Sequence, residues 1–215
     1  MPNADFAAAQ HASRHAAGGP DAVTPQSINA AAATHTHAAA DVGAAPASRF
    51  RTGTGPPNGS VSAPVGTEYT DTAGTNGAWK WLKTSGTGNT GWVVLVGDTG
   101  PRDISSYLTN GWELGSYGFV SVRRIDTIVE LTVERINSAS AATNFLFGGA
   151  YPTGFRPPRT VRLLFHTHAS VPEVRRGQVN TDVEVVNGMN SGQFYLVQLY
   201  TTDEPWPSTL PGTPL

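Results

Sequence analysis

The sequence predicts a mainly β protein that begins with a segment of a different kind. Residues 1–50 contain 18 alanines and no tryptophan, whereas all five tryptophans follow residue 77. Apolar and polar residues alternate with period two in the C-terminal half, which is typical of strands with one buried face. We therefore expect an extended Ala/Gly-rich segment with short helical turns at 1–50, a small β module at 51–100, and an antiparallel β-sandwich head of jelly-roll type at 101–215.

The N-terminal segment has too few bulky side chains to fold alone. Thr24 followed by Pro25 is typical of a helix start, and Gly43 of a helix end. Alanine buries little surface, so its burial does not offset the conformational entropy lost on ordering. The segment therefore needs a partner surface, a ligand or sister copies of itself, unless it is a flexible low-complexity linker.

The small module combines aromatic stretches with turn clusters rich in Gly, Asn and Thr, such as "TAGTNG" and "SGTGNTG". We expect two or three short antiparallel strands. Trp79 and Trp81 should share one strand face, and Trp92 and Val94 a face of the next strand. A module of about fifty residues is near the size at which independent stability becomes marginal.

The head carries the clearest strand patterns. In "TIVELTVERI", three apolar residues alternate with three polar ones: Val129, Leu131 and Val133 with Glu130, Thr132 and Glu134. A second strand is expected from Val179 to Val185, then a turn at Asn187-Gly188 and a strand from Phe194 to Tyr200. The stretch "YPTGFRPPRT" is predicted to be a proline-rich crossing loop.

Charge and composition exclude several classes of partner. The formal net charge is −2, which gives no basic surface for nucleic acid or an anionic membrane. No apolar run approaches the roughly 18 residues of a membrane span, and the first residues lack the layout of a signal peptide. The chain has no cysteine, so disulfides and thiolate metal sites are excluded.

We expect no catalysis. Four acidic residues alternate with apolar ones and therefore predict a solvated sheet face: Glu130, Glu134, Asp182 and Glu184. A glycosidase would need two carboxylates at a defined separation in a cleft, and no pair is indicated. The sequence contains no nucleophile elbow, no HExxH and no phosphate-binding loop between a strand and a helix.

The six histidines form three pairs: His11 with His15, His35 with His37, and His166 with His168. The last pair should lie on one strand face, exposed or partly packed, and the first in a capping or packing role. His35 and His37 point to the same side of an extended backbone. They could join His11 and His15 in a four-nitrogen zinc site, or supply the same count in a two-fold dimer. A three-fold axis would instead give six imidazoles, which suit iron or another octahedral first-row metal.

Several stretches resemble phage tail fibres and minor tail proteins, particularly those of phages that infect actinobacteria. They are "HASRHAAGGPDAVTP", "THTHAAADVGA" and "PVGTEYTDTAGTNGAWKWLKTSGTGNTGW", followed by "GFVSVRRIDTIVELTV", "YPTGFRPPRT" and "TTDEPWPSTLPG". The resemblance implies a homotrimer whose N-terminal segment attaches to other tail-tip proteins. In several such fibres a His-x-His from each of three chains binds one iron on the three-fold axis, and His35 and His37 match that pattern.

The resemblance therefore implies a structural virion protein of the tail, found outside the cell after host lysis. Its trimeric head is expected to recognise a host surface glycan or another envelope component, and trimerisation would strengthen weak contacts. Four loop aromatic residues could stack on sugar rings, although each also suits a core or an interface: Trp112, Tyr117, Tyr151 and Trp206. The alternatives are a purely architectural tail-tip or decoration subunit and a cell-wall or polysaccharide hydrolase.

Overall fold

A computed structural model describes residues 14, 22, 36, 37, 43, 44, 47–138, 145–168, 173–185 and 193–215. Strands make up 47% of these residues, which confirms the mainly β class. Residues 47–215 form one compact unit, which contains every strand of the described residues. Residues 1–46 form a separate unit, and the predicted helix start at Thr24 and Pro25 lies outside the described residues.

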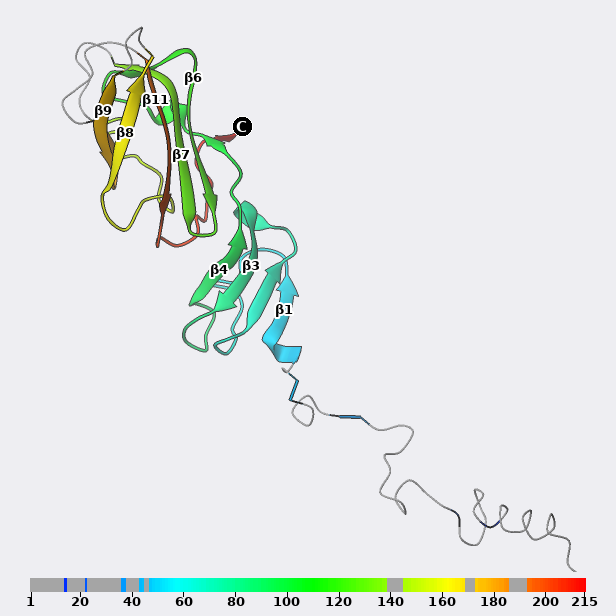
Figure 1. Ribbon diagram of the computed structural model, residues 1–215. Coiled ribbons are helices and arrows are strands. Elements are labelled where there is room, and N and C mark those ends of the chain that lie inside the picture. The colour runs from blue at the N-terminus through cyan, green and yellow to red at the C-terminus, as the bar shows by residue number, and fades with distance from the viewer. Residues whose placement is uncertain are drawn as a thin grey trace, which may run out of the picture. The chain divides into compact units, whose positions relative to one another are not determined.

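The first sheet has four strands in the order β1-β2-β3-β4 (Figure 1). Short 3-10 helices precede β1 and β3: η3 (Ala47–Arg49) and η4 (Thr75–Gly77). The strands are β1 (Phe50–Gly53), β2 (Glu68–Asp71), β3 (Ala78–Lys83) and β4 (Trp92–Gly97). The pairs β2–β3 and β3–β4 are antiparallel as predicted, but β1 adds a parallel strand that the sequence did not predict.

The core of this sheet corrects one prediction. Trp81 is buried but Trp79 is 50% exposed, so the two do not share a face. The cause is a register shift between β3 and β4 at Lys80, because an extra residue in one strand reverses the alternation of its side chains. Trp92 is buried and Val94 packs against the same cluster, as expected of residues on one face.

The second sheet has eight strands in the order β10-β9-β8-β11-β7-β6-β5-β12, and its paired strands are antiparallel. They are β5 (Arg102–Asp103), β6 (Trp112–Ile125), β7 (Ile128–Ser138), β8 (Val161–Thr167), β9 (Val174–Val179), β10 (Val183–Val185), β11 (Phe194–Thr201) and β12 (Thr213–Pro214). Helix η5 (Ser105–Tyr107) follows β5. The ladder is one continuous curled antiparallel sheet, which is consistent with the predicted β-rich, sandwich-like fold (Figure 1).

The core of the eight-stranded sheet follows the predicted alternation. Val129, Leu131 and Val133 are buried on β7, and the residues between them are partly exposed. The expected crossing loop, residues 151–160, also belongs to this core, because Tyr151 and Phe155 are fully buried, as are Leu146 and Phe147 just before it. The loop therefore covers part of the buried face of the sheet.

The predicted single strand from Val179 to Val185 is wrong. The chain turns at Asn180–Asp182, and β10 pairs back on β9 with Val183 opposite Val179. The pattern of apolar residues fits a single strand and also two strands joined by a tight turn, because the turn keeps all of these residues on the buried face. The turn predicted at Asn187-Gly188 lies outside the described residues.

Candidate functional site

A groove with a volume of about 690 Å³ lies where loops of the two sheets meet. Its size is typical of small-ligand sites. Three segments supply most of its walls: β4 with the loop before β2, the β6–β7 turn, and the chain after β11. The residues that line the groove include Asn58, Asn76, Trp81, Trp92, Arg124, Asp126, Asp203, Glu204, Trp206 and Pro207.

Arg124 is a buried cation in the wall of the groove, only 5% exposed. Its Nε donates to the carbonyl oxygen of Asp126 at 2.8 Å, and its Nη1 donates to those of Gly154 and Pro205 at 2.6 and 3.0 Å. Burial lowers the pKa of the Arg124 guanidinium, while the carboxylate charges of Glu204 and Asp126 oppose that effect. Backbone carbonyl oxygens therefore hold this charge in place of a directly bonded carboxylate.

Trp206 covers Arg124 and links the two sheets. The guanidinium carbon of Arg124 lies 5.0 Å from the centroid of the Trp206 ring, a cation–π contact. The ring also lies against Gly97, where an added Cβ would be 2.5 Å from it. The indole Nε1 donates to the carbonyl oxygen of Asn76 at 3.0 Å, and Asn76 donates back to that of Ser208 at 2.6 Å. The Trp206 ring is thus partly buried, in contact with both Arg124 and Gly97.

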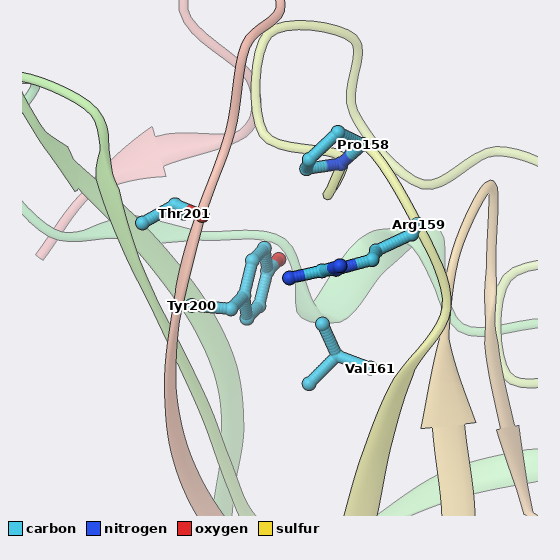
Figure 2. A pocket seen from close by; sticks show the side chains of 5 residues that line it. All are labelled: Pro158, Arg159, Val161, Tyr200 and Thr201. Carbon is cyan, nitrogen blue, oxygen red and sulfur yellow. The ribbon is translucent and has the colours of Figure 1, made fainter.

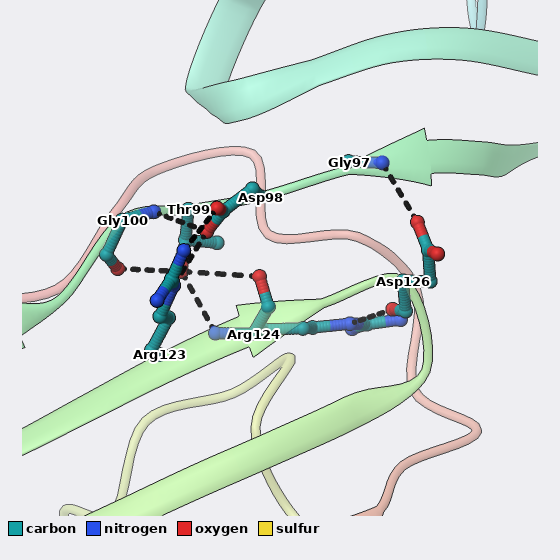
Figure 3. A network of polar contacts seen from close by, with 7 residues as sticks. All are labelled: Gly97, Asp98, Thr99, Gly100, Arg123, Arg124 and Asp126. Atoms are coloured by element: carbon teal, nitrogen blue, oxygen red, sulfur yellow. Dashed lines mark hydrogen bonds and ion pairs between the residues drawn. The ribbon is translucent and has the colours of Figure 1, made fainter.

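An ion pair and backbone hydrogen bonds fix the junction between β4 and β6 (Figure 3). Arg123 donates from Nε and Nη2 to the two carboxylate oxygens of Asp98, at 3.0 and 2.5 Å. These bonds hold the pKa of Asp98 below its usual range, against the opposing effect of partial burial. The Gly97 N–H donates to Asp126 Oδ1 at 2.9 Å, and the Asp126 N–H donates to the Gly97 carbonyl oxygen at the same distance. These contacts therefore hold the end of β4 and the β6–β7 turn in a fixed arrangement beside the groove.

The groove retains both donors and acceptors without protein partners. Within the described part of the chain, Arg124 Nη2 donates no hydrogen bond and Asp126 Oδ2 accepts none. Asp203 on the rim is exposed and has no described partner. A hydroxyl group both donates and accepts, so a polyhydroxylated ligand matches this mixture of groups.

A second cavity lies between β8 and β11, where their ladder ends after two residue pairs. It has a volume of about 390 Å³ and is lined by Pro158, Arg159, Val161, Tyr200 and Thr201. In Figure 2 the side chain of Arg159 extends toward Tyr200, and Val161 lies beside it. The polar side chains here are few, and the Tyr200 hydroxyl is already bonded to the carbonyl oxygen of Phe155. The larger groove is the better candidate.

The predicted metal ligands are described only in part. His35 lies outside the described residues, as do His11 and His15, and His37 is exposed. Among the described residues, no group of three or more His, Asp or Glu side chains could hold a metal ion. The metal site at His35 and His37 therefore stays a prediction. His166 and His168 are exposed as expected, and the His168 ring contacts Tyr195 edge-on at 5.5 Å.

One of the four acidic residues predicted to be solvated is not. Glu130, Glu134 and Glu184 are partly exposed, but Asp182 is only 3% exposed. Its carboxylate accepts hydrogen bonds from the backbone N–H groups of Phe147, Gly149 and Val183, at 3.1, 2.5 and 2.6 Å. These bonds stabilise the buried charge, since a carboxylate can leave water when N–H donors replace it.

The four candidate aromatic residues divide into three kinds. Trp112 and Tyr151 are buried core residues, and Trp206 is partly buried at the groove. Tyr117 is 90% exposed and has φ 62°, in the left-handed region, where β6 departs from regular pairing with β7. Of these four residues, Trp206 is the one that lines the groove.

Arg124, Asp126 and Asp203 line the groove but were not predicted from the sequence. For Arg124 a signal was available, because it continues the buried phase of Val120 and Val122 along β6. A charged residue in a buried strand phase indicates a bonded interior charge. Asp126 and Asp203 carry no such signal, since both stand in ordinary polar turns.

Comparison of the sequence with models of known protein families finds no match, and comparison with curated proteins finds none either. No helix within the described ranges is long and apolar enough to cross a membrane.

Proposed function

We propose that this chain is a structural protein of a phage tail that binds a saccharide of the host cell surface and does not cleave it. The groove carries the proposal. Its unpartnered donors and acceptors match sugar hydroxyls. Because hydrogen bonds already hold the surrounding strands in place, little conformational entropy is lost when a ligand binds. The resemblance of the sequence to tail fibres and minor tail proteins supplies the biological setting.

The proposal includes a homotrimer that is attached to other tail-tip proteins through residues 1–50. Three copies raise the effective concentration of weak saccharide sites, so shallow grooves suffice. The octahedral metal at His35 and His37 belongs to this assembly. Metal analysis of the purified chain is expected to give one first-row metal, such as iron, per three chains, and none in His37→Ala. One metal per chain would instead support the four-histidine zinc site.

The full-length chain is expected to bind cell-wall or capsular glycans on an array and to adhere to susceptible cells. Asp203→Ala should raise the dissociation constant by about ten- to a hundredfold, because a charge-assisted hydrogen bond contributes roughly 1.5–3 kcal/mol. Asp203 is exposed and unpartnered among the described residues, so its loss should leave the melting temperature unchanged. Binding is measured by calorimetry with the glycan that the array identifies.

Glu113→Ala is the matched control, since Glu113 is an exposed carboxylate on β6 that does not line the groove. Equal binding by both variants would show that the saccharide does not bind in the groove. An array and cell assay without any binding would favour the architectural subunit. Release of reducing sugar from host walls would favour the hydrolase.

A further inference from the structure

One face of the eight-stranded sheet exposes large apolar side chains across neighbouring strands. Val197 and Leu199 on β11 are 68% and 57% exposed, and Leu164 on β8 is 56% exposed. β8 and β11 are adjacent in the sheet, and Figure 1 shows them side by side. We name the outward residues of β7, β8, β9 and β11 the outer face.

The strand register places these residues opposite the core. On β11 the alternate residues Leu196 and Tyr200 are buried, so Val197 and Leu199 point the other way. β11 is thus apolar on both faces. A strand with one face in water would carry polar residues there, as β7 does with Glu130 and Thr132 opposite Leu199 and Val197. Such an exposed apolar patch marks an interaction surface.

Charges flank the apolar residues with opposite sign. On the β8–β9 side, Leu164 pairs with Arg176, and Arg162 lies on the same outward phase. On the β7 side, Leu199 pairs with Glu130. Arg176 is exposed and has no bonded partner among the described residues. The outer face is therefore complementary to itself, because its arginine side fits the glutamate side of another copy.

We propose that the outer face is a contact between copies of this chain, with the arginine side of one copy against the glutamate side of the next. Repeated around an axis, this head-to-tail contact closes a ring. The inference rests on the trimer of the proposed function and names the surface that closes it. It concerns residues 47–215 and requires no contribution from the histidine segment.

The absence of cysteine makes a thiol-labelling test direct. Val197→Cys places one thiol on the outer face, and Val96→Cys places one on β4, where Val96 is 48% exposed. Both are introduced into the full chain, and circular dichroism checks the fold. In the assembled protein we expect V197C to react with a maleimide at least about tenfold more slowly than V96C, because thiol reactivity depends on exposure. Dilution below the assembly concentration should equalise the two rates.

A charge reversal tests the orientation of the contact. Adding Arg176→Glu to V197C should speed labelling, because like charges would face each other across the contact. Arg175→Glu is the matched control, since Arg175 pairs with the buried residue Phe165 and so lies on the opposite strand phase. Equal rates for V197C and V96C at every concentration would overturn the proposal.

Light scattering on the same samples separates the possible failures. Three chains per particle with an unprotected V197C would mean assembly through another surface, and would leave the proposed trimer intact. A monomer would overturn both the contact and the trimer. Saccharide binding by Asp203→Ala and by the unmodified chain is measured independently. The proposed saccharide site is therefore tested separately from the contact between copies.

Discussion

Replacing Arg124 with leucine is expected to lower the free energy of unfolding by about 3–5 kcal/mol. The substitution leaves the carbonyl oxygens of Asp126, Gly154 and Pro205 without their donor, and each unsatisfied buried acceptor is costly. Trp206 also loses the cation that packs on its ring. Urea unfolding followed by tryptophan fluorescence measures the effect.

Arg123→Leu is the matched control at the neighbouring position. Its ion pair with Asp98 has both side chains 39% exposed, so its loss should reduce stability by about 1 kcal/mol or less. Arg124→Lys keeps a charge but lacks the planar set of donors, and should fall between the two. Similar losses for Arg123→Leu and Arg124→Leu would contradict the assigned role of the buried guanidinium.

Local pattern predicted the strands that lie wholly within one stretch of sequence. The alternation in "TIVELTVERI" is realised on β7 because its outward residues are polar and its inward residues reach the core. Pairing between distant segments leaves no such pattern. The parallel pairing of β1 with β2 joins Phe50 to Glu68, and no local rule specifies it. The same limit explains why the order of the eight strands could not be predicted from the sequence.

The groove could not be predicted from the sequence for the same reason. Its walls come from segments more than a hundred residues apart, as the hydrogen bond from Trp206 to Asn76 illustrates. The sequence predicted Trp81 and Trp92 in a small β module and singled out Trp206, but it did not predict that these residues line one groove. Trp206 was considered both as a platform for sugar rings and as a core or interface residue, and it is partly buried in contact with Arg124 and Gly97. Contact chemistry at such a site follows from topology, which local periodicity does not encode.

Asp182→Ala is the second substitution with a large expected effect, a loss of about 2–4 kcal/mol in the free energy of unfolding. Sequence alternation assigned this carboxylate to a solvated face, but the tight turn after β9 directs it inward. There it joins the turn to the buried segment that contains Phe147 and Gly149. Without it, buried N–H groups lose their acceptor, and the segment covering the sheet loses an anchor. Urea unfolding measures the change.

Glu184→Ala provides the comparison two residues further on. Glu184 lies on the outward phase of β10, and its carboxylate accepts a hydrogen bond from the side chain of Gln178, so its loss should change stability by less than about 1 kcal/mol. Asp182→Asn should be intermediate, because its amide nitrogen replaces one acceptor oxygen with a donor facing another N–H. If Asp182→Ala and Glu184→Ala were equally stable, the buried carboxylate would not hold the segment. The ordering Glu184→Ala, Asp182→Asn, Asp182→Ala in increasing loss follows only when both carboxylate oxygens accept from the backbone.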